Sequence, residues 1–226
     1  CHRASDKGKG LEVDKLDAAA LGRHFDAYVG RLARLCGIDP ASDPNTRAGL
    51  VATLVDSYEV GSQNWTAGFE KTFAERRGYP LFKYLPALTG YVVDSTAETD
   101  SFLFDFRRTV ADAFAENYAD ALAKKCEAAG LLLAVEPYGS APCDNLRYAR
   151  SVHLPMSEFW ARAPAEVDPQ NVHIVASSAH LRGRRYVGAE AFTTFSENAG
   201  WRQDPWSYKA QGDVVYCGVL NRIGYH

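Results

Sequence analysis

The sequence predicts an α/β fold, a (β/α)8 barrel of the TIM type, of which this chain holds about the second half and the helix before it. Near-continuous apolar stretches of strand length alternate with helical patterns, which is typical of a parallel sheet covered by helices. Three of these stretches, residues 51–59, 131–136 and 184–190, close on a glutamate. Because barrel enzymes keep their chemistry at the carboxyl ends of their strands, the glutamates predict one shared active site.

The composition is that of a globular protein with a sizeable core. The chain has 226 residues, of which 46% are hydrophobic and 12% aromatic. The 25 Lys and Arg residues against 28 Asp and Glu give a net charge of -3, without a basic block or an acidic tail. This balance disfavours nucleic acid and anionic membranes as partners. No apolar run reaches the roughly 20 residues of a membrane span, so membrane insertion is not expected.

The cysteines and the chain ends bear on domain organisation. The five cysteines include no CxxC pair, which argues against a zinc site and a disulfide scaffold, and the odd count leaves at least one of them unpaired. The chain begins with Cys1 and without the apolar core of a signal peptide, and it ends in NRIGYH, which has the pattern of a strand. We therefore expect residues 1–226 to be part of a single catalytic barrel domain within a larger multidomain protein.

The first half of the chain predicts one strand framed by helices. Residues 11–16 have the pattern of the close of a short strand, and apolar positions from Leu21 to Leu35 mark one face of a helix that ends near Cys36. A proline-rich loop then leads to the strand at 51–58. Residues 63–78 read as a helix with Trp65, Phe69 and Phe73 spaced four apart. The proline-punctuated stretch 79–90 is expected to cap the mouth of the barrel.

The longest predicted helix follows, and after it the strands recur. Ser95 and Glu98 form a capping box at the start of this helix, which keeps an i+4 apolar stripe as far as Gly130. Further strands are predicted at 131–136, 151–156, 184–190 and 221–226, with helices at 170–183 and 208–219. Counted from Val51, these five strands would be the fourth to eighth of a barrel. No glycine-rich phosphate loop interrupts a strand-to-helix turn, which argues against nucleotide binding.

The carboxylates at the strand ends are the candidates for catalysis. An unpaired buried charge costs several kcal/mol, so each of them needs a compensating partner. A salt bridge to an arginine would explain any single glutamate, but it explains Asp56, Glu59, Glu136 and Glu190 together less well. Glycoside hydrolysis uses two carboxyl groups, one as acid and one as base or nucleophile. At the fourth and seventh strands, Glu59 and Glu190 would face each other across the barrel.

Aromatic residues gather near the same strand ends and would suit the flat C–H faces of sugars. Each of them could equally be a packing residue. His153 and His180 are more typical of structural groups than of catalysts. The aromatic candidates are Tyr58, Trp65, Tyr138, Phe159, Trp160, Phe192, Trp201 and Trp206.

Several motifs, taken in order, resemble one family of enzymes. They are the run DSYEVGSQNWTAGFEKTFAERRGYPLFKYLPALTG, the helix DFRRTVADAFAENYADAL, and then AVEPYG, PMSEFW and VGAEAFT. They are similar to the α-L-rhamnosidases of glycoside hydrolase family 106, from GLEVDKL to NRIGYH. The resemblance implies a large, mostly bacterial, multidomain enzyme, secreted or periplasmic, whose barrel is accompanied by accessory domains of the same chain. Its activity would remove terminal α-L-rhamnose from a glycan or glycoside with inversion, assisted by calcium.

The resemblance also implies residue roles. Glu59 in DSYE would be the general acid and Glu190 in GAEAF the general base. Asp56 and Glu158 would bind calcium, which prefers oxygen ligands and lowers the pKa of nearby carboxyl groups. Burial would keep the acid protonated. An inverting pair needs roughly 6.5 to 9.5 Å between its carboxyl groups to admit water. The residues expected to bind substrate are Asp56, Tyr58, Trp65, Glu136, Tyr138 and Trp160.

Two other functions remain open from the sequence. One is a retaining β-glycosidase of the related barrel clan, with Glu190 as nucleophile. The other is a carbohydrate-binding barrel that has lost catalysis, although the presence of both Glu59 and Glu190 argues against it.

Overall fold

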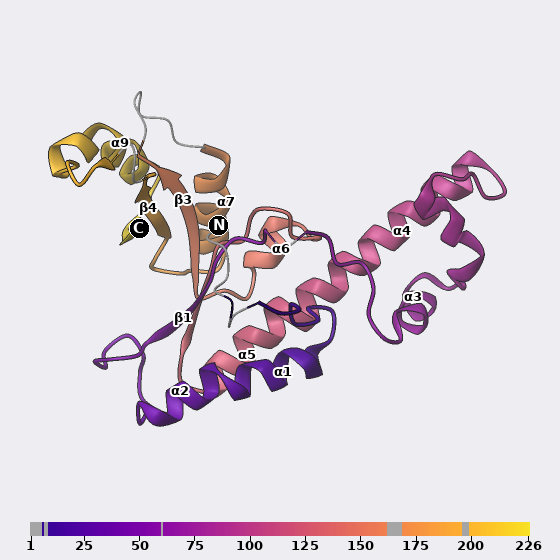
Figure 1. The fold of residues 1–226 in the computed structure, drawn as a ribbon, viewed down its shortest axis with the longest axis horizontal. Helices are drawn as coiled ribbons and strands as arrows, with labels where there is room; N and C mark the ends of the chain where they lie inside the picture. Colours follow the sequence, from indigo (N-terminus) through magenta and orange to yellow (C-terminus); the bar gives the residue numbers. More distant parts are fainter. Residues whose placement is uncertain (1–5, 7–8, 60, 162–168, 196–198) are drawn as a thin grey trace.

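The computed structural model of the protein describes residues 6, 9–59, 61–161, 169–195 and 199–226. Its centre is one parallel sheet of five strands, with helices packed beside it and a long helical arm that extends away from it (Figure 1). The strands are β1 (Ala52–Val55), β2 (Leu132–Val135), β3 (Leu154–Trp160), β4 (Gly188–Thr193) and β5 (Arg222–Tyr225).

The order of the strands in the sheet follows the sequence, β1-β2-β3-β4-β5, and every neighbouring pair is parallel. This arrangement confirms the predicted α/β class and the predicted order of all five strands. It is a curled sheet consistent with part of a barrel; closure into eight strands stays a prediction. Parallel neighbours require a crossover between them, and helices supply it here.

The helices are mostly short, apart from the composite rod formed by α4, η2 and α5. Helix α5 packs on β2 and α7 packs on β3, so these two helices cover the middle of the sheet. The helical segments are α1 (Ala18–Ala27), α2 (Val29–Leu35), α3 (Phe69–Arg77), η1 (Phe82–Thr89), α4 (Thr96–Phe114), η2 (Ala115–Asp120), α5 (Ala121–Ala128), α6 (Asn145–Ala149), α7 (Pro169–Leu181) and α9 (Pro205–Cys217).

Two apolar clusters form the core. The first joins the N-terminal helices, the arm and β2, and in it Phe73 and Phe102 lie with ring centroids 5.8 Å apart. The second joins β3, β4, α7 and α9, and in it the rings of Phe159 and Phe192 meet edge to face at 4.8 Å. The predicted helical stripe that includes Phe102 and Phe114 is therefore confirmed as a core face.

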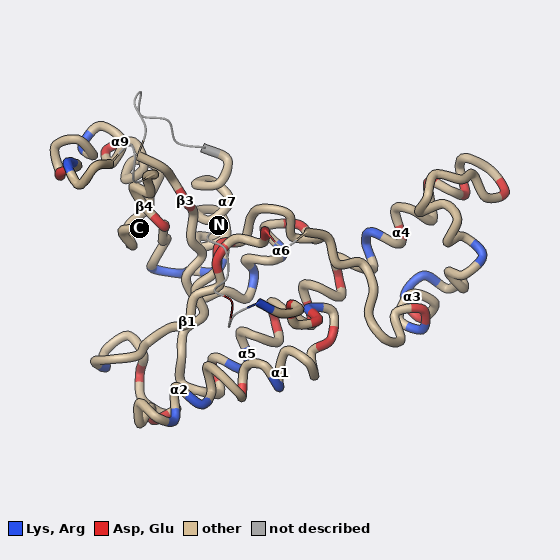
Figure 2. Tube along the Cα trace, viewed as in Figure 1, with Lys and Arg blue, Asp and Glu red and all other residues tan. Residues whose placement is uncertain are grey.

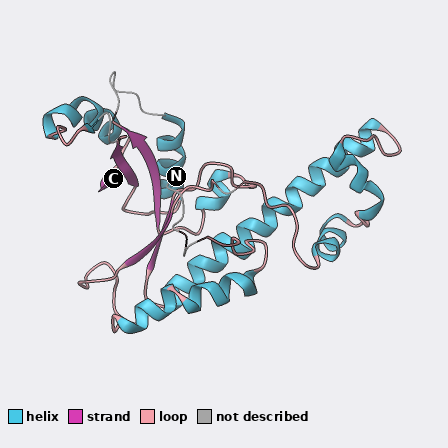
Figure 3. Ribbon diagram, in the orientation of Figure 1, coloured by secondary structure: helices cyan, strands magenta, loops and turns pink. Residues whose placement is uncertain are grey.

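The arm consists of α3, η1 and the first half of α4 (Figure 3). Residues 79–90, expected to cap a barrel mouth, instead lie at the outer end of α4, away from the strands. The reason is aromatic packing, because Tyr84 stacks on Phe102 of α4 at 5.3 Å and meets Tyr79 at 5.7 Å. That prediction was wrong.

Other predicted elements differ in detail. The helix expected from Leu21 to Cys36 is broken at Tyr28 into α1 and α2. Residues 11–16 form no strand but an irregular segment, because the Asp14 carboxylate accepts hydrogen bonds from Leu16 N at 2.9 Å and from Thr66 Oγ1 at 2.7 Å. The cap at Ser95 is confirmed, since its hydroxyl accepts from Glu98 N at 3.2 Å.

The predicted positions of two strands also shift. The strand expected at 151–156 runs from Leu154 to Trp160, which brings Glu158 into the sheet, and the strand expected at 184–190 begins at Gly188. Lys and Arg positions are interspersed with Asp and Glu positions along the described trace (Figure 2). Among the described residues, no helix is long and apolar enough to cross a membrane.

Candidate active site

Three carboxylates meet at the carboxyl edge of the sheet. Asp56 follows the last residue of β1, Glu136 follows the last residue of β2, and Glu190 lies in β4. One oxygen from each of the three lies within 4.8 Å of the others. The carboxyl ends of parallel strands lie at one edge of the sheet. Glu136 and Glu190 therefore come close to Asp56, although they follow it by 80 and 134 positions in the sequence. The sequence analysis singled out all three.

Glu136 is the buried centre of this group, with no exposed surface. Its Oε2 accepts hydrogen bonds from the Tyr138 hydroxyl at 2.8 Å and from Ser57 N at 3.2 Å. Its Oε1 is buried and has no hydrogen-bond partner among the described groups. Burial raises the pKa of Glu136 to about 9, and the adjacent Asp56 carboxyl and the charge of Glu190 add to that rise. The site therefore requires a proton or a cation at this carboxylate.

A glycine holds the tips of β1 and β2 together. Tyr58 pairs with Gly139 in an isolated parallel bridge, and Ser140 N donates to Tyr58 O at 2.9 Å. Gly139 has φ +91°, and a Cβ there would lie 2.7 Å from Tyr58 O. Only glycine allows this approach without displacing the backbone. The turn fixes Ser57 N beside Glu136, a contact that the sequence analysis did not foresee.

Tyr138 links Glu136 to a fourth carboxylate, Glu158. Its hydroxyl faces Glu136 Oε2 at 2.8 Å and Glu158 Oε2 at 3.3 Å. Burial raises the pKa of Tyr138, and the charge of Glu136 raises it further, so the phenol stays a proton donor. The Trp160 ring N–H donates to Glu158 Oε1. Glu158 and Glu190 are register partners on β3 and β4, so the network spans four neighbouring strands.

Glu190 is oriented by a bulge at the end of β4. Phe159 pairs with Ala191 but Trp160 pairs with Thr193, which leaves Phe192 as the extra residue, in the left-handed region at φ +58°. Bulges re-aim side chains at the ends of strands. Here the Thr193 hydroxyl donates to Glu190 Oε1 at 2.8 Å. 

His226 is a site residue that the sequence analysis missed. Its Nδ1 lies 3.2 Å from Glu190 Oε1. The residue follows β5 directly, so the rule that parallel strands share their carboxyl edge would have placed it there. Its position next to the carboxylate suits a group that orients Glu190.

The remaining predicted residues are Glu59, Tyr58 and Trp65. Glu59 is exposed on the segment after β1, so the expected burial of the general acid is wrong, and it is not one of the three clustered carboxylates. Tyr58 is 6% exposed and its ring meets Phe114 at 5.7 Å, so it belongs to the core. Trp65 packs on Phe69 with centroids 5.2 Å apart, at the base of the arm.

The donor set suits a hard divalent cation. Calcium takes six to eight oxygen ligands, and carboxylates are its commonest side-chain ligands. Asp56, Glu136 and Glu190 offer oxygens close together, and Glu136 Oε1 is a buried acceptor without a hydrogen bond. Of the two predicted ligands, Asp56 belongs to this set, whereas both oxygens of Glu158 accept hydrogen bonds from Tyr138 and Trp160. The residues present therefore fit a calcium ion.

Comparison with known proteins assigns the chain to a protein family. The model of glycoside hydrolase family 106, described as alpha-L-rhamnosidase, matches residues 1–226. The chain belongs to this family. A protein of Formosa agariphila (strain DSM 15362 / KCTC 12365 / LMG 23005 / KMM 3901 / M-2Alg 35-1), named "Putative beta-glucuronidase", is 39% identical over 230 residues, which is 100% of this chain and 18% of the relative.

A solved structure agrees with that placement. The structure titled "Structure of Rhamnosidase from Novosphingobium sp. PP1Y" matches with a TM-score of 0.86 at 31% sequence identity. The match covers 100% of this chain and 22% of that one. The chain therefore spans about a fifth of the length of these relatives. Family membership confirms the resemblance found in the sequence, and the length of the relatives fits the expected accessory domains.

Proposed function

We propose that the clustered carboxylates belong to the active site of a glycoside hydrolase that removes terminal α-L-rhamnose from a glycan or glycoside. The observation that carries this proposal is the convergence of Asp56, Glu136 and Glu190 within 4.8 Å at the carboxyl edge of the sheet, in a chain of the α-L-rhamnosidase family. The match to a structure titled as a rhamnosidase supports the same activity.

In the proposed inverting mechanism, Glu59 is the general acid and Glu190 the general base. The Thr193 hydroxyl donates to Glu190 Oε1 at 2.8 Å, which holds the carboxylate in place to accept a proton from water. Glu59 is exposed beside the same strand ends, where a leaving group could reach it. The acid gives its proton to the glycosidic oxygen, while water activated by Glu190 attacks the anomeric carbon from the other face.

Asp56 and Glu136 would hold a calcium ion in this site, and the adjacent Glu190 would stay available as the base. When bound, the ion would supply a positive charge that orients vicinal hydroxyls of the sugar. Tyr138 and Ser57 N fix Glu136 from the other side, so the carboxylate presents Oε1 to the site. Glu158 and Trp160 then form the neighbouring wall of the sugar subsite.

A second candidate is a retaining β-glycosidase with Glu190 as nucleophile. The name of the Formosa agariphila relative, which refers to β-glucuronide hydrolysis, favours it. A retaining pair stands only about 5 to 5.5 Å apart, because no water lies between the carboxylate and the anomeric carbon.

The test uses the intact longer protein with an aryl α-L-rhamnoside, in calcium and in EDTA. We expect Glu59→Gln and Glu190→Gln each to lower kcat by about a thousandfold or more with the circular dichroism spectrum unchanged. Proton NMR of the first sugar released should show the anomer of inverted configuration. Substantial turnover by either variant would refute its assigned role, and retained configuration would favour the second candidate.

A further inference from the structure

A large pocket lies where the arm meets the loops after β1 and β2. Its volume is about 610 Å³. Three parts of the chain form it: residues 62–64 after β1, residues 87–90 at the end of η1, and residues 103–110 of α4, with Pro142 from the loop after β2. We call it the arm pocket. The loop 62–64 begins three residues after Glu59, and Pro142 lies six residues after Glu136, so both segments follow the strand-end carboxylates closely in the sequence.

The arm pocket has an apolar wall and one positively charged side chain. Leu88, Leu103, Phe106 and Val110 form the wall. Arg107 is the charged residue among its described lining residues, and it makes no ion pair or hydrogen bond within the described part of the chain.

Neighbouring arginines differ in this respect. Arg108 pairs with Asp112 at 3.1 Å, and Arg77 pairs with the same carboxylate at 3.1 Å. The charge of Arg107 is not neutralised in this way, so the field in the arm pocket favours an anion. A guanidinium also matches the planar geometry of a carboxylate.

The rim of the pocket has polar side chains that can form hydrogen bonds with the hydroxyl groups of a ligand. Ser62 and Asn64 have no hydrogen-bond partner among the described residues, so their side chains are available to a ligand. Gln63 between them is held in place, because its Oε1 accepts from Lys15 N at 3.0 Å and its amide N–H donates to Asp14. The fixed Gln63 keeps its two neighbours at the rim.

We propose that the arm pocket binds an acidic sugar, a hexuronic acid unit of the glycan, with its carboxylate on Arg107. The apolar wall suits the C–H face of a pyranose ring, and Ser62 and Asn64 suit its hydroxyls. That this unit belongs to the leaving group of the cleaved glycan rests on the proposed function. Binding of the acidic sugar does not.

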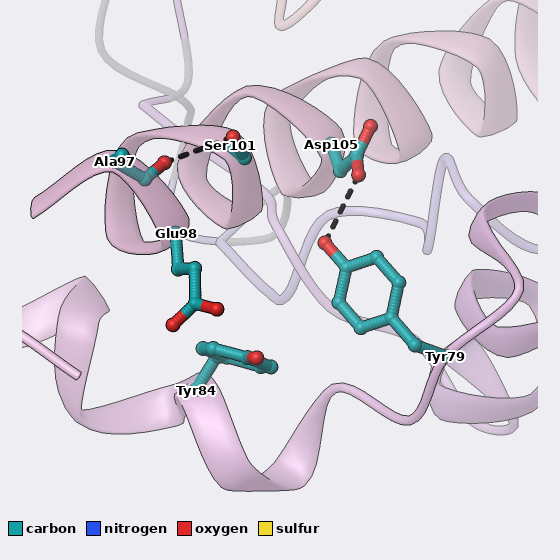
Figure 4. A pocket seen from close by; sticks show the side chains of 6 residues that line it. All are labelled: Tyr79, Tyr84, Ala97, Glu98, Ser101 and Asp105. Atoms are coloured by element: carbon teal, nitrogen blue, oxygen red, sulfur yellow. Dashed lines mark hydrogen bonds between the residues drawn. The ribbon is translucent and has the colours of Figure 1, made fainter. Parts of the chain in front are cut away.

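A second pocket on the arm is lined by negatively charged side chains. Its volume is about 300 Å³, and Glu98 and Asp105 lie beside Tyr79 and Tyr84 in it (Figure 4). The Tyr79 hydroxyl donates to Asp105 at 3.0 Å. A uronate would be repelled there, so the arm pocket is the one of these two that suits a carboxylate.

The experiment measures binding of methyl α-D-galacturonide and methyl α-D-galactoside to the intact longer protein by NMR titration at low salt. The two sugars differ in a carboxylate against a hydroxymethyl group. We expect the acidic sugar to bind at least about tenfold more tightly, and Arg107→Ala to remove most of this preference. Arg107→Lys should keep part of it. Arg108→Ala, on the next residue of α4, is the matched control and should leave the preference within about twofold.

Each outcome decides the proposal. Equal binding of the two sugars, or a preference that survives Arg107→Ala, would overturn it. A fall in the Tm of the intact protein on Arg107→Ala, with sugar binding unchanged, would instead assign the pocket to a contact with another part of the longer chain. Selective binding of the acidic sugar by a protein that releases no rhamnose would support the arm pocket while the proposed function fails.

Discussion

The buried carboxyl group of Glu136 makes the stability of the folded protein depend on pH. In the calcium-free protein its pKa is about 9, whereas an unfolded chain ionises this group near 4.5. Below pH 4.5 the group is protonated in both states. Between these values the unfolded state releases a proton that the folded state keeps, so the folded state loses stability as pH rises, by about 1.4 kcal/mol per pH unit from this group. Calcium at the carboxylate would replace the proton.

This reasoning predicts the behaviour of Glu136→Gln, which mimics the protonated group. In EDTA, the free energy of unfolding of the variant should depend less on pH between 5 and 8 than that of the parent protein, and it should be no lower at pH 8. Calcium should raise the Tm of the parent but not that of the variant, and more so at high pH, because binding releases the proton. Chemical and thermal unfolding with EDTA or calcium measure both effects. Parallel pH profiles in EDTA would contradict the prediction.

At the scale of elements, the turn through Gly139 joins β1 to β2 at the site. Gly139→Ala would place a methyl group 2.7 Å from Tyr58 O in a left-handed conformation. We expect it to lower the free energy of unfolding by about 1 to 3 kcal/mol and to lower kcat by moving Ser57 N away from Glu136. Gly78→Ala is the matched control.

The control separates the strain of a left-handed backbone from the steric clash of the added methyl group. Gly78 also has a left-handed φ of +83°, but a Cβ there meets nothing within 4 Å. It ends α3 on the arm, far from the carboxylates. Gly78→Ala should therefore cost stability and leave kcat unchanged. Urea unfolding measures the stability of the two variants, and initial rates measure their kcat. An equal loss of kcat in both would show that the Gly139 turn has no special role.

The elements also show what the sequence reveals about the fold. The five strands and their order were predictable, because short stretches with strand patterns alternate with helical patterns along the chain. The bulge at Phe192 was not, since it depends on how β3 and β4 pair. The π-helical turns of η2 are hidden for a similar reason, because its residues continue the apolar stripe of α4. The cluster of Asp56, Glu136 and Glu190 followed from strand ends, and the same rule would have included His226, but the turn at Gly139 needed coordinates.

At the scale of the molecule, β1 and β5 are the outer strands of the described sheet. Leu54 of β1 is 54% exposed and Tyr225 of β5 is 73% exposed, although central positions of parallel strands are normally buried. Unpaired strand edges with apolar side chains favour association. Residues 1–226 produced alone should therefore self-associate at micromolar concentration, whereas the longer protein should not.

Size-exclusion chromatography with light scattering measures this difference. Leu54→Lys should reduce self-association of the segment, because a lysine opposes edge pairing. Leu146→Lys, at an exposed position of α6, is the control and should leave it unchanged. A monodisperse, monomeric segment would contradict the prediction.

The rod of α4, η2 and α5 is continuous from the arm to the start of β2, and at the helical rise it is about 50 Å long. Its α5 end packs against β2, the strand that leads to Glu136, and Arg107 lies within α4, where the helix lines the arm pocket. Inserting or deleting one helical turn between Arg107 and α5 would move the arm pocket by about 5.4 Å relative to the sheet, so the length of the rod sets the spacing between the pocket and the strand-end carboxylates.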